Sequence, residues 1–115
     1  MVDVANFVEI ALSFPEVSEH KHFEKPSFRV AKKIFATLDI PNHQACIKLS
    51  EIDQDVFAAF DRSVIFPVPN KWGKQGWTFI NLDKVESELL TDALTTAYCT
   101  VAPKKLSSLV RPTLD

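Results

Sequence analysis

The residues best suited to bind a ligand lie in one short segment, Trp72-Gly73-Lys74-Gln75-Gly76-Trp77, which holds both glycines of the chain. Glycine permits positive φ angles and close backbone approach, and loops carried by a rigid sheet are where binding residues concentrate. An indole beside an ammonium group offers a flat, positively charged stacking surface, which suits a nucleobase, an aromatic ligand or a partner's side chain. The predicted contact residues of this loop are Trp72, Lys74 and Gln75. Its predicted structural residues are Gly73, Gly76 and Trp77.

The alternative is that this loop is only a structural turn. Both indoles would then cap the hydrophobic core, and both glycines would satisfy backbone geometry. Trp77 fits this interpretation better than Trp72, because Trp77 opens a strand-like run. The sequence leaves both interpretations open.

A second candidate site is a basic segment whose members are Lys25, Arg29, Lys32 and Lys33. If Phe28 and Val30 face a core, Arg29 faces outward, because successive residues of a strand point to opposite faces. Two lysines would stand at the projecting tip of a hairpin, where contact with a phosphate backbone is possible. The alternative is a solvated tip and an edge strand that its charges protect from aggregation.

Metal-binding and catalytic patterns are weak. His20 and His22 would point the same way in an extended chain and could share a metal with a carboxylate. Lys21 would repel a cation, however, and no further Cys/His pair lies nearby. The isolated Cys46 and Cys99 are typical of buried thiols. The chain carries no nucleophile elbow, phosphate-binding loop, zinc-protease helix or dinucleotide fingerprint. We therefore predict a non-enzymatic protein without a metal or cofactor.

Composition indicates one globular domain over residues 1–115, with 46% hydrophobic and 24% charged residues. No apolar run is long enough to cross a bilayer, so no membrane partner is expected. The start of the chain lacks a basic region and cleavage site, which predicts a cytoplasmic protein without a signal peptide. The net charge of −2 argues mildly against non-specific nucleic-acid binding.

Apolar periodicity predicts three main helices and about five strands. The first helix starts near Asp3 and ends at Phe14-Pro15, the second runs from the Ser50 cap to Phe60, and the third runs from about Ser87 to Pro103. One or two further turns follow at 104–109. The predicted strands are 27–31, 34–38, 45–49, 64–68 and 77–82. Segments 16–25 and 70–76 read as polar loops. The order α-β-β-β-α-β-β-α predicts an α+β fold, with an antiparallel sheet and helices packed on one face.

Five stretches, in order and spacing, resemble the MmcQ/YjbR family. They are Ala11–Val17, His22–Val30, Lys33–Thr37, Trp72–Thr78 and Ala102–Leu106. The resemblance implies a frataxin-like (CyaY-like) α+β fold, which is also described as a double wing. Members of the family are often labelled DNA-binding. The chain departs from the family at Lys32-Lys33, where a glycine-containing turn is common. Iron binding, which a frataxin-like fold suggests, is not expected, because the first helix carries only Asp3 and Glu9.

The sequence and the resemblance together predict a binding domain whose function is uncharacterised. The resemblance implies DNA or another nucleic acid as the partner, bound by the basic hairpin and the Trp72–Gly76 loop. The alternative is a module that uses the Trp72 loop to bind another protein or a small ligand. The oligomeric state cannot be read from the sequence.

Overall fold

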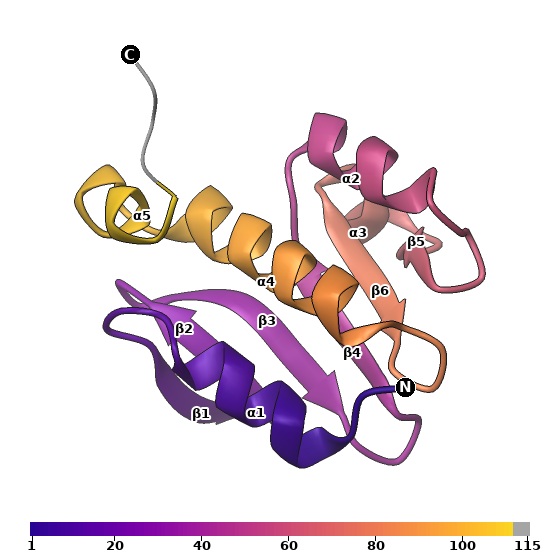
Figure 1. Ribbon diagram of the computed structural model, residues 1–115, viewed down its shortest axis with the longest axis horizontal. Helices are drawn as coiled ribbons and strands as arrows, with labels where there is room; N and C mark the ends of the chain where they lie inside the picture. Colours follow the sequence, from indigo (N-terminus) through magenta and orange to yellow (C-terminus); the bar gives the residue numbers. More distant parts are fainter. Residues whose placement is uncertain (112–115) are drawn as a thin grey trace.

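The chain folds into one antiparallel sheet and a set of helices, in the α+β arrangement that the sequence predicts (Figure 1). The computed structural model describes residues 1–111. The six strands of the sheet have the order β1-β2-β3-β4-β6-β5. They are β1 (Ser18–His22), β2 (Lys25–Val30), β3 (Lys33–Asp39), β4 (Gln44–Lys48), β5 (Ile65–Pro67) and β6 (Trp77–Asn81). The helices are α1 (Val4–Leu12), α2 (Glu51–Ala58), α3 (Lys71–Lys74), α4 (Ser87–Val101) and α5 (Lys104–Val110).

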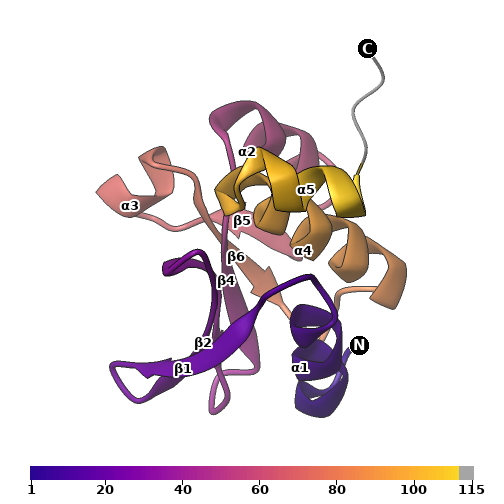
Figure 2. The same ribbon diagram turned by 90° about the vertical axis from the view of Figure 1, so that its left-hand side faces the viewer.

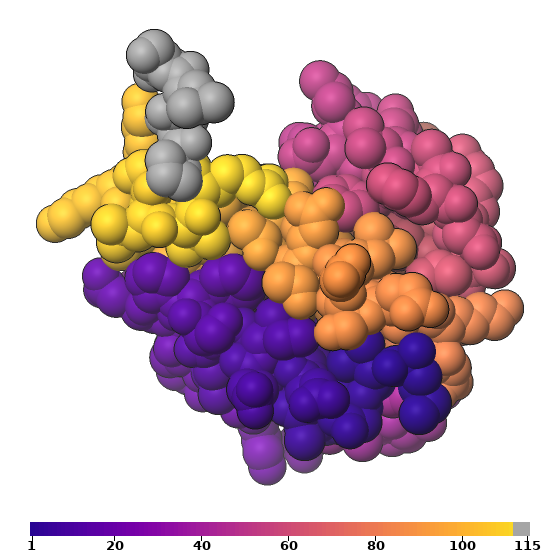
Figure 3. Space-filling view, viewed as in Figure 1, coloured from indigo at the N-terminus to yellow at the C-terminus, as the bar shows by residue number. Residues whose placement is uncertain are grey.

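The helices divide between the two sides of the sheet. Helices α1 and α4 lie against one face and α5 packs on α4, whereas α3 lies on the other side (Figure 2). The space-filling view shows the helical side, where α1, α4 and α5 form much of the surface (Figure 3). Helix α2 packs against the edge strand β5. No helix within residues 1–111 is both long enough and apolar enough to span a membrane.

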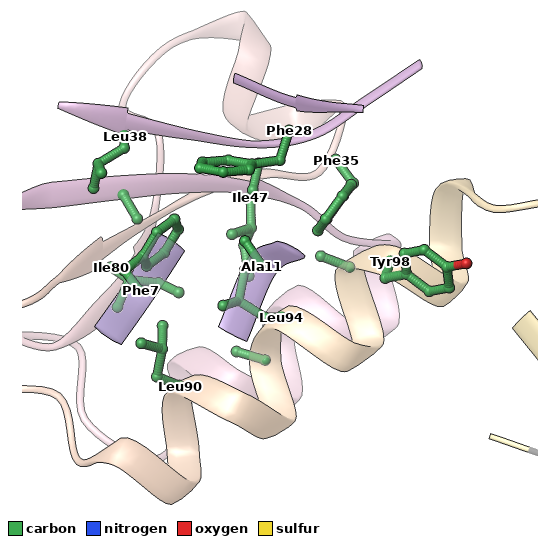
Figure 4. Packing of buried hydrophobic residues seen from close by; sticks show 14 of the residues in the cluster. Phe7, Ala11, Phe28, Phe35, Leu38, Ile47, Ile80, Leu90, Leu94 and Tyr98 are labelled. Carbon is green, nitrogen blue, oxygen red and sulfur yellow. The ribbon is translucent and has the colours of Figure 1, made fainter. Parts of the chain in front are cut away.

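The core lies between the helical layer and the sheet (Figure 4). Helical spacing turns Phe7 and Ala11 of α1 inward, and both side chains are fully buried. Tyr98 of α4 stacks on Phe14 with ring centroids 5.0 Å apart, and its hydroxyl donates a hydrogen bond to the carbonyl oxygen of Pro15 at 2.7 Å. Burying one large apolar side chain contributes about 1.5–3 kcal/mol, so this cluster fixes which face of the sheet the helices cover.

Two elements occupy segments that the sequence reads as loops. Strand β1 lies in segment 16–25 and pairs with β2 along its whole length, which gives six strands instead of about five. All five of its side chains are exposed, so apolar alternation gives no signal for it. Helix α3 lies in segment 70–76, where the side chain of Asn70 caps it by accepting a hydrogen bond from the backbone nitrogen of Trp72 at 2.9 Å.

The hairpin between β2 and β3 turns one residue earlier than predicted. Val30 pairs with Lys33, so the two turn residues are Ala31 and Lys32 instead of Lys32 and Lys33. Their φ angles are 50° and 70°, which places both residues in the left-handed region that a type I′ turn requires. The sequence prediction of a two-residue hairpin therefore holds, although neither residue is one that this turn favours.

Candidate ligand groove on the open sheet face

The face of the sheet opposite α1 and α4 is called the open face here. Strand register identifies its residues, because paired residues on neighbouring antiparallel strands point to the same side. Thr37 pairs with Cys46, and Cys46 pairs with Phe79, so these three side chains form a row across β3, β4 and β6. Their strand neighbours Leu38 and Ile80 are buried in the core. The row therefore faces away from the helices.

A groove of about 460 Å³ lies on the open face. Its lining is rich in aromatic rings and consists of His22, Phe23, Lys25, Ile34, Thr37, Cys46, Val68, Trp72, Trp77 and Phe79. The turn between β1 and β2 supplies one wall, and Trp72 of α3 supplies the other. Phe23 is 86% exposed and Trp72 is 50% exposed. A concave site with apolar walls and a few polar groups is the usual form of a ligand-binding site.

Helix α3 is held against α2 and β6 by a buried amide. Gln54 of α2 is 6% exposed, and its Nε2 lies 2.9 Å from the Gly73 carbonyl oxygen, 3.2 Å from that of Trp77 and 3.0 Å from Thr78 Oγ1. These contacts tie the residue that follows Trp72, and the start of β6, to α2. The side chain that forms one wall of the groove is thus positioned by an amide on a different element.

Both glycines of this loop are required by close backbone approach. A Cβ at Gly73 would lie 1.9 Å from the carbonyl oxygen of Val68, and a Cβ at Gly76 would lie 1.8 Å from that of Leu49. Gly76 also has a φ of +102°, which side chains rarely allow. The loop can therefore lie this close to the backbone of Val68 and Leu49 only because positions 73 and 76 lack a side chain.

Positive charge surrounds the aromatic lining. The ammonium of Lys48 lies 5.6 Å from the ring centroid of Trp77, and that of Lys71 lies 5.7 Å from the ring centroid of Trp72. Both distances allow cation–π attraction. Arg29 pairs with Ile34 and so faces the same side of the sheet. Its Nε is buried, and within the described residues it has no hydrogen-bond partner.

The acidic side chain among the open-face strand positions, Asp39, is already paired. Asn42 donates hydrogen bonds to its carboxylate, and Lys25 Nζ lies 3.4 Å away. The Asn42 hydrogen bonds, with a smaller effect from the Lys25 charge, hold the pKa of Asp39 below its usual value. Asp39 therefore stays ionised at neutral pH and offsets one of the cations near the groove.

Cys46 lies in the floor of the groove without the properties of a reactive thiol. Burial raises the pKa of Cys46 to about 11, so the thiol is protonated at neutral pH. Thiolates, and not thiols, attack substrates and bind metals. Within residues 1–111, no group of three His, Cys, Asp or Glu side chains is placed to hold a metal ion. Contact with Cys46 in the groove is therefore apolar.

The structure brings together some of the predicted site residues and separates others. Trp72, Trp77 and Lys25 meet in the groove. Lys32 is in the turn at the opposite end of β2, which spans about 17 Å from Lys25 to Val30, and neither Lys32 nor Lys33 lines the groove. Because Lys33 pairs with buried Val30, it belongs to the helical side of the sheet.

The remaining loop residues contact other parts of the molecule. Lys74 lines a separate polar hollow between α2 and α3 that also contains Glu51. The carbonyl oxygen of Gln75 accepts a hydrogen bond from the ammonium of Lys48.

The groove residues that the sequence analysis did not select are His22, Phe23, Ile34, Thr37, Cys46, Val68 and Phe79. Alternation along β4 and β6 marks Cys46 and Phe79 as facing opposite the core, which is the signal that was available for them.

Comparison with known proteins places the fold. The YjbR family model matches residues 12–100. A crystal structure of the Deinococcus radiodurans protein DR2400, which has a DUF419 domain, superimposes with a TM-score of 0.79 at 21% sequence identity. The superposition covers 100% of this chain and 94% of that chain. No curated protein matches this sequence.

Proposed function

The chain belongs to the YjbR family, and from the surface that its fold leaves open we propose that it binds single-stranded nucleic acid along the groove. The observation that carries the proposal is that exposed aromatic rings and cationic side chains share the open face. Unpaired bases stack on aromatic side chains, and each such contact contributes about 1–3 kcal/mol. Lysine and arginine neutralise the phosphates between the bases.

The distribution of charge supports this partner in spite of the net charge of −2. Strand positions on the open face carry Lys25, Arg29 and Lys48, against the single carboxylate of Asp39. The acidic block of the chain belongs to α2 and the turn after it, outside the open-face strand positions. It consists of Glu51, Asp53, Asp55 and Asp61. A polyanion on the open face would therefore meet a locally positive surface.

The proposal differs from the DNA-binding role that the family resemblance implies. That role uses Lys32 and Lys33 at a hairpin tip together with the Trp72 loop. In the fold neither Lys32 nor Lys33 lines the groove that contains Trp72, so the proposed contact does not need the tip. Stacking on exposed rings also requires unpaired bases, which favours a single strand over a duplex.

A small planar anion is the second candidate, and the size of the groove favours it. A volume of about 460 Å³ suits one small ligand. A mononucleotide and an oligonucleotide share the chemistry of a flat base and a phosphate, so both would use Trp72 and the nearby cations. An oligonucleotide reaches more of the cations on the open face than a mononucleotide does, and the salt dependence of binding therefore distinguishes the two candidates.

The test is fluorescence anisotropy of a labelled oligothymidylate of about 12 nucleotides at several salt concentrations. The affinity should fall with salt, and replacing Lys48 with Ala should reduce the logarithmic slope by about 0.7, which corresponds to one phosphate contact. The loss of one stacking platform in Trp72→Ala should weaken binding by about 5- to 150-fold. The matched control is Lys104→Ala on α5, on the helical side, which should leave binding unchanged.

Three results would contradict the proposal. The first is an oligonucleotide affinity that neither depends on salt nor changes in Trp72→Ala. The second is equal weakening by Lys48→Ala and Lys104→Ala, which would indicate only a diffuse charge effect. The third is thymidine monophosphate bound as tightly as the oligomer, which would replace the proposal with the small-ligand candidate.

A further inference from the structure

Helix α2 exposes an apolar ridge to solvent. Ile52 is 76% exposed, Val56 is 54% exposed and Phe60 is 67% exposed. Their spacing of four residues places them in one line along α2 and the turn that follows it. The inward face of the same helix is supplied by Gln54, Phe57 and Ala58, which are buried. The α2 ridge (Ile52, Val56 and Phe60) is therefore extra apolar surface beyond what the fold buries.

The α2 ridge is flanked by acids, which are Glu51, Asp53, Asp55 and Asp61. The nearby cations are Arg62 in sequence, Lys84, whose positive charge attracts the carboxylate of Asp61, and Lys74, which lines the same hollow as Glu51. Among the salt bridges of residues 1–111, none includes any of these four carboxylates. The surface therefore combines three large apolar side chains with bordering carboxylates, of which Glu51, Asp53 and Asp55 belong to the same helix. On most surface helices, charged residues border the apolar face that the core buries. On α2 they border Ile52, Val56 and Phe60, which nothing in the described chain covers.

The charge decides what can cover the α2 ridge. Nucleic acid and anionic lipid would be repelled by the four carboxylates. Two copies of α2 packed symmetrically would bring the same acids against each other, because a two-fold interface places like patches together. A partner with apolar residues at helical spacing and lysine or arginine on either side satisfies both features.

We propose that the α2 ridge docks a basic amphipathic helix of a partner protein. The partner's apolar side chains would pack on Ile52, Val56 and Phe60, and its cations would face the flanking carboxylates. The site is separate from the groove, because α2 packs on the edge strand β5 and lies at the outer edge of the molecule (Figures 1 and 2). The protein could then hold its groove ligand and a protein partner at the same time.

The test uses a labelled synthetic peptide of about 15 residues, with leucines at helical spacing and lysines elsewhere. We expect saturable binding by fluorescence anisotropy. Val56→Ser/Phe60→Ser should weaken it at least tenfold, and Asp53→Lys/Asp55→Lys should do the same. All four positions are on the surface, and circular dichroism checks that the variants fold. Leu109→Ser on α5, where the side chain is 69% exposed, is the matched control and should leave binding unchanged.

Peptide controls decide the remaining outcomes. A scrambled peptide of the same composition, and a version with glutamate in place of lysine, should both bind at least tenfold more weakly. Equal binding of either control, or full binding by Val56→Ser/Phe60→Ser, would overturn the proposal. So would analytical ultracentrifugation showing that the protein dimerises and that Val56→Ser/Phe60→Ser abolishes the dimer, because a second copy would then be the occupant.

Discussion

Replacing Gln54 should show whether one buried amide holds the Trp72 wall of the groove in place. Gln54→Met keeps the length of the side chain and removes its two N–H donors. The acceptors do not become fully orphaned: the Gly73 oxygen also accepts from the backbone nitrogen of Gly76 at 3.1 Å, and the Trp77 oxygen accepts from that of Val68 at 3.0 Å. The cost should therefore lie at the lower end of the usual penalty, about 1–2 kcal/mol.

Gln54→Glu should cost more, in a way that depends on pH. At pH 7 a carboxylate would be buried with one of its oxygens facing the three oxygens that now contact Gln54 Nε2, at a cost of about 3 kcal/mol or more. Burial and repulsion raise the folded-state pKa of this glutamate above its unfolded value, so the variant loses stability as pH rises. The penalty should shrink as pH falls toward about 4.5, where the protonated acid can donate one hydrogen bond.

Urea denaturation of the two variants and the parent protein at both pH values measures these differences directly. Both variants should also bind the oligonucleotide more weakly than the parent at temperatures where they remain folded, because α3 loses its anchor. A Gln54→Glu protein as stable as the parent at pH 7, or a penalty that does not change with pH, would refute the role assigned to this amide.

Three further predictions follow from backbone geometry and thiol burial. Lys32→Gly should stabilise the protein by about 1 kcal/mol, because Lys32 has a φ of 70°, which glycine adopts without strain. It should leave oligonucleotide binding unchanged. A lower melting temperature than the parent's would contradict the first expectation. Gly76→Ala should destabilise by about 3 kcal/mol or more, because its Cβ would lie 1.8 Å from the Leu49 oxygen, and a melting temperature equal to the parent's would count against the geometry. In a Cys99→Ser variant, the rate at which iodoacetamide alkylates Cys46 should still rise between pH 8 and pH 10, because the pKa of Cys46 is about 11. A rate that levels off below pH 9 would contradict this pKa.

The fold was predictable where side chains alternate between core and solvent. In strand β4 the buried residues Ala45 and Ile47 alternate with partly exposed ones, and α1 repeats apolar residues at helical spacing. Strand β1 was not predictable in this way. Its side chains are all exposed, and it is a strand because β2 offers it a full set of backbone partners. Pairing of this kind depends on a neighbouring strand and leaves no local pattern.

The candidate site was predictable in its central residue and not in its extent. The Trp72 loop stands out in the sequence by its composition. Phe23 is far from it along the chain and joins it only because β2, β3, β4 and β6 pair side by side in the sheet. The basic hairpin divides for a geometric reason. Lys25 lines the groove, whereas Lys32 follows the other end of the extended strand β2 and does not.

The α2 ridge shows a different limit of pattern analysis. Ile52, Val56, Phe57 and Phe60 indicate an amphipathic helix, and apolar periodicity normally points to the buried face. The structure buries Phe57 and leaves the other three exposed. Sequence periodicity reports that a helix has apolar residues at regular spacing. It does not show which apolar residues of the helix the fold buries and which it leaves exposed.

We propose that a ligand binds on the open face, between the turn of β1 and β2 and helix α3. The most direct measurement is an NMR titration of ¹⁵N-labelled protein with the oligothymidylate, following the two indole N–H signals and the backbone amides. Binding in the groove should shift the indole signals of Trp72 and Trp77 together with amide signals of β3, β4 and β6, while the amide signals of α5 stay in place. Unmoved indole signals, or shifts confined to the helical side, would contradict it.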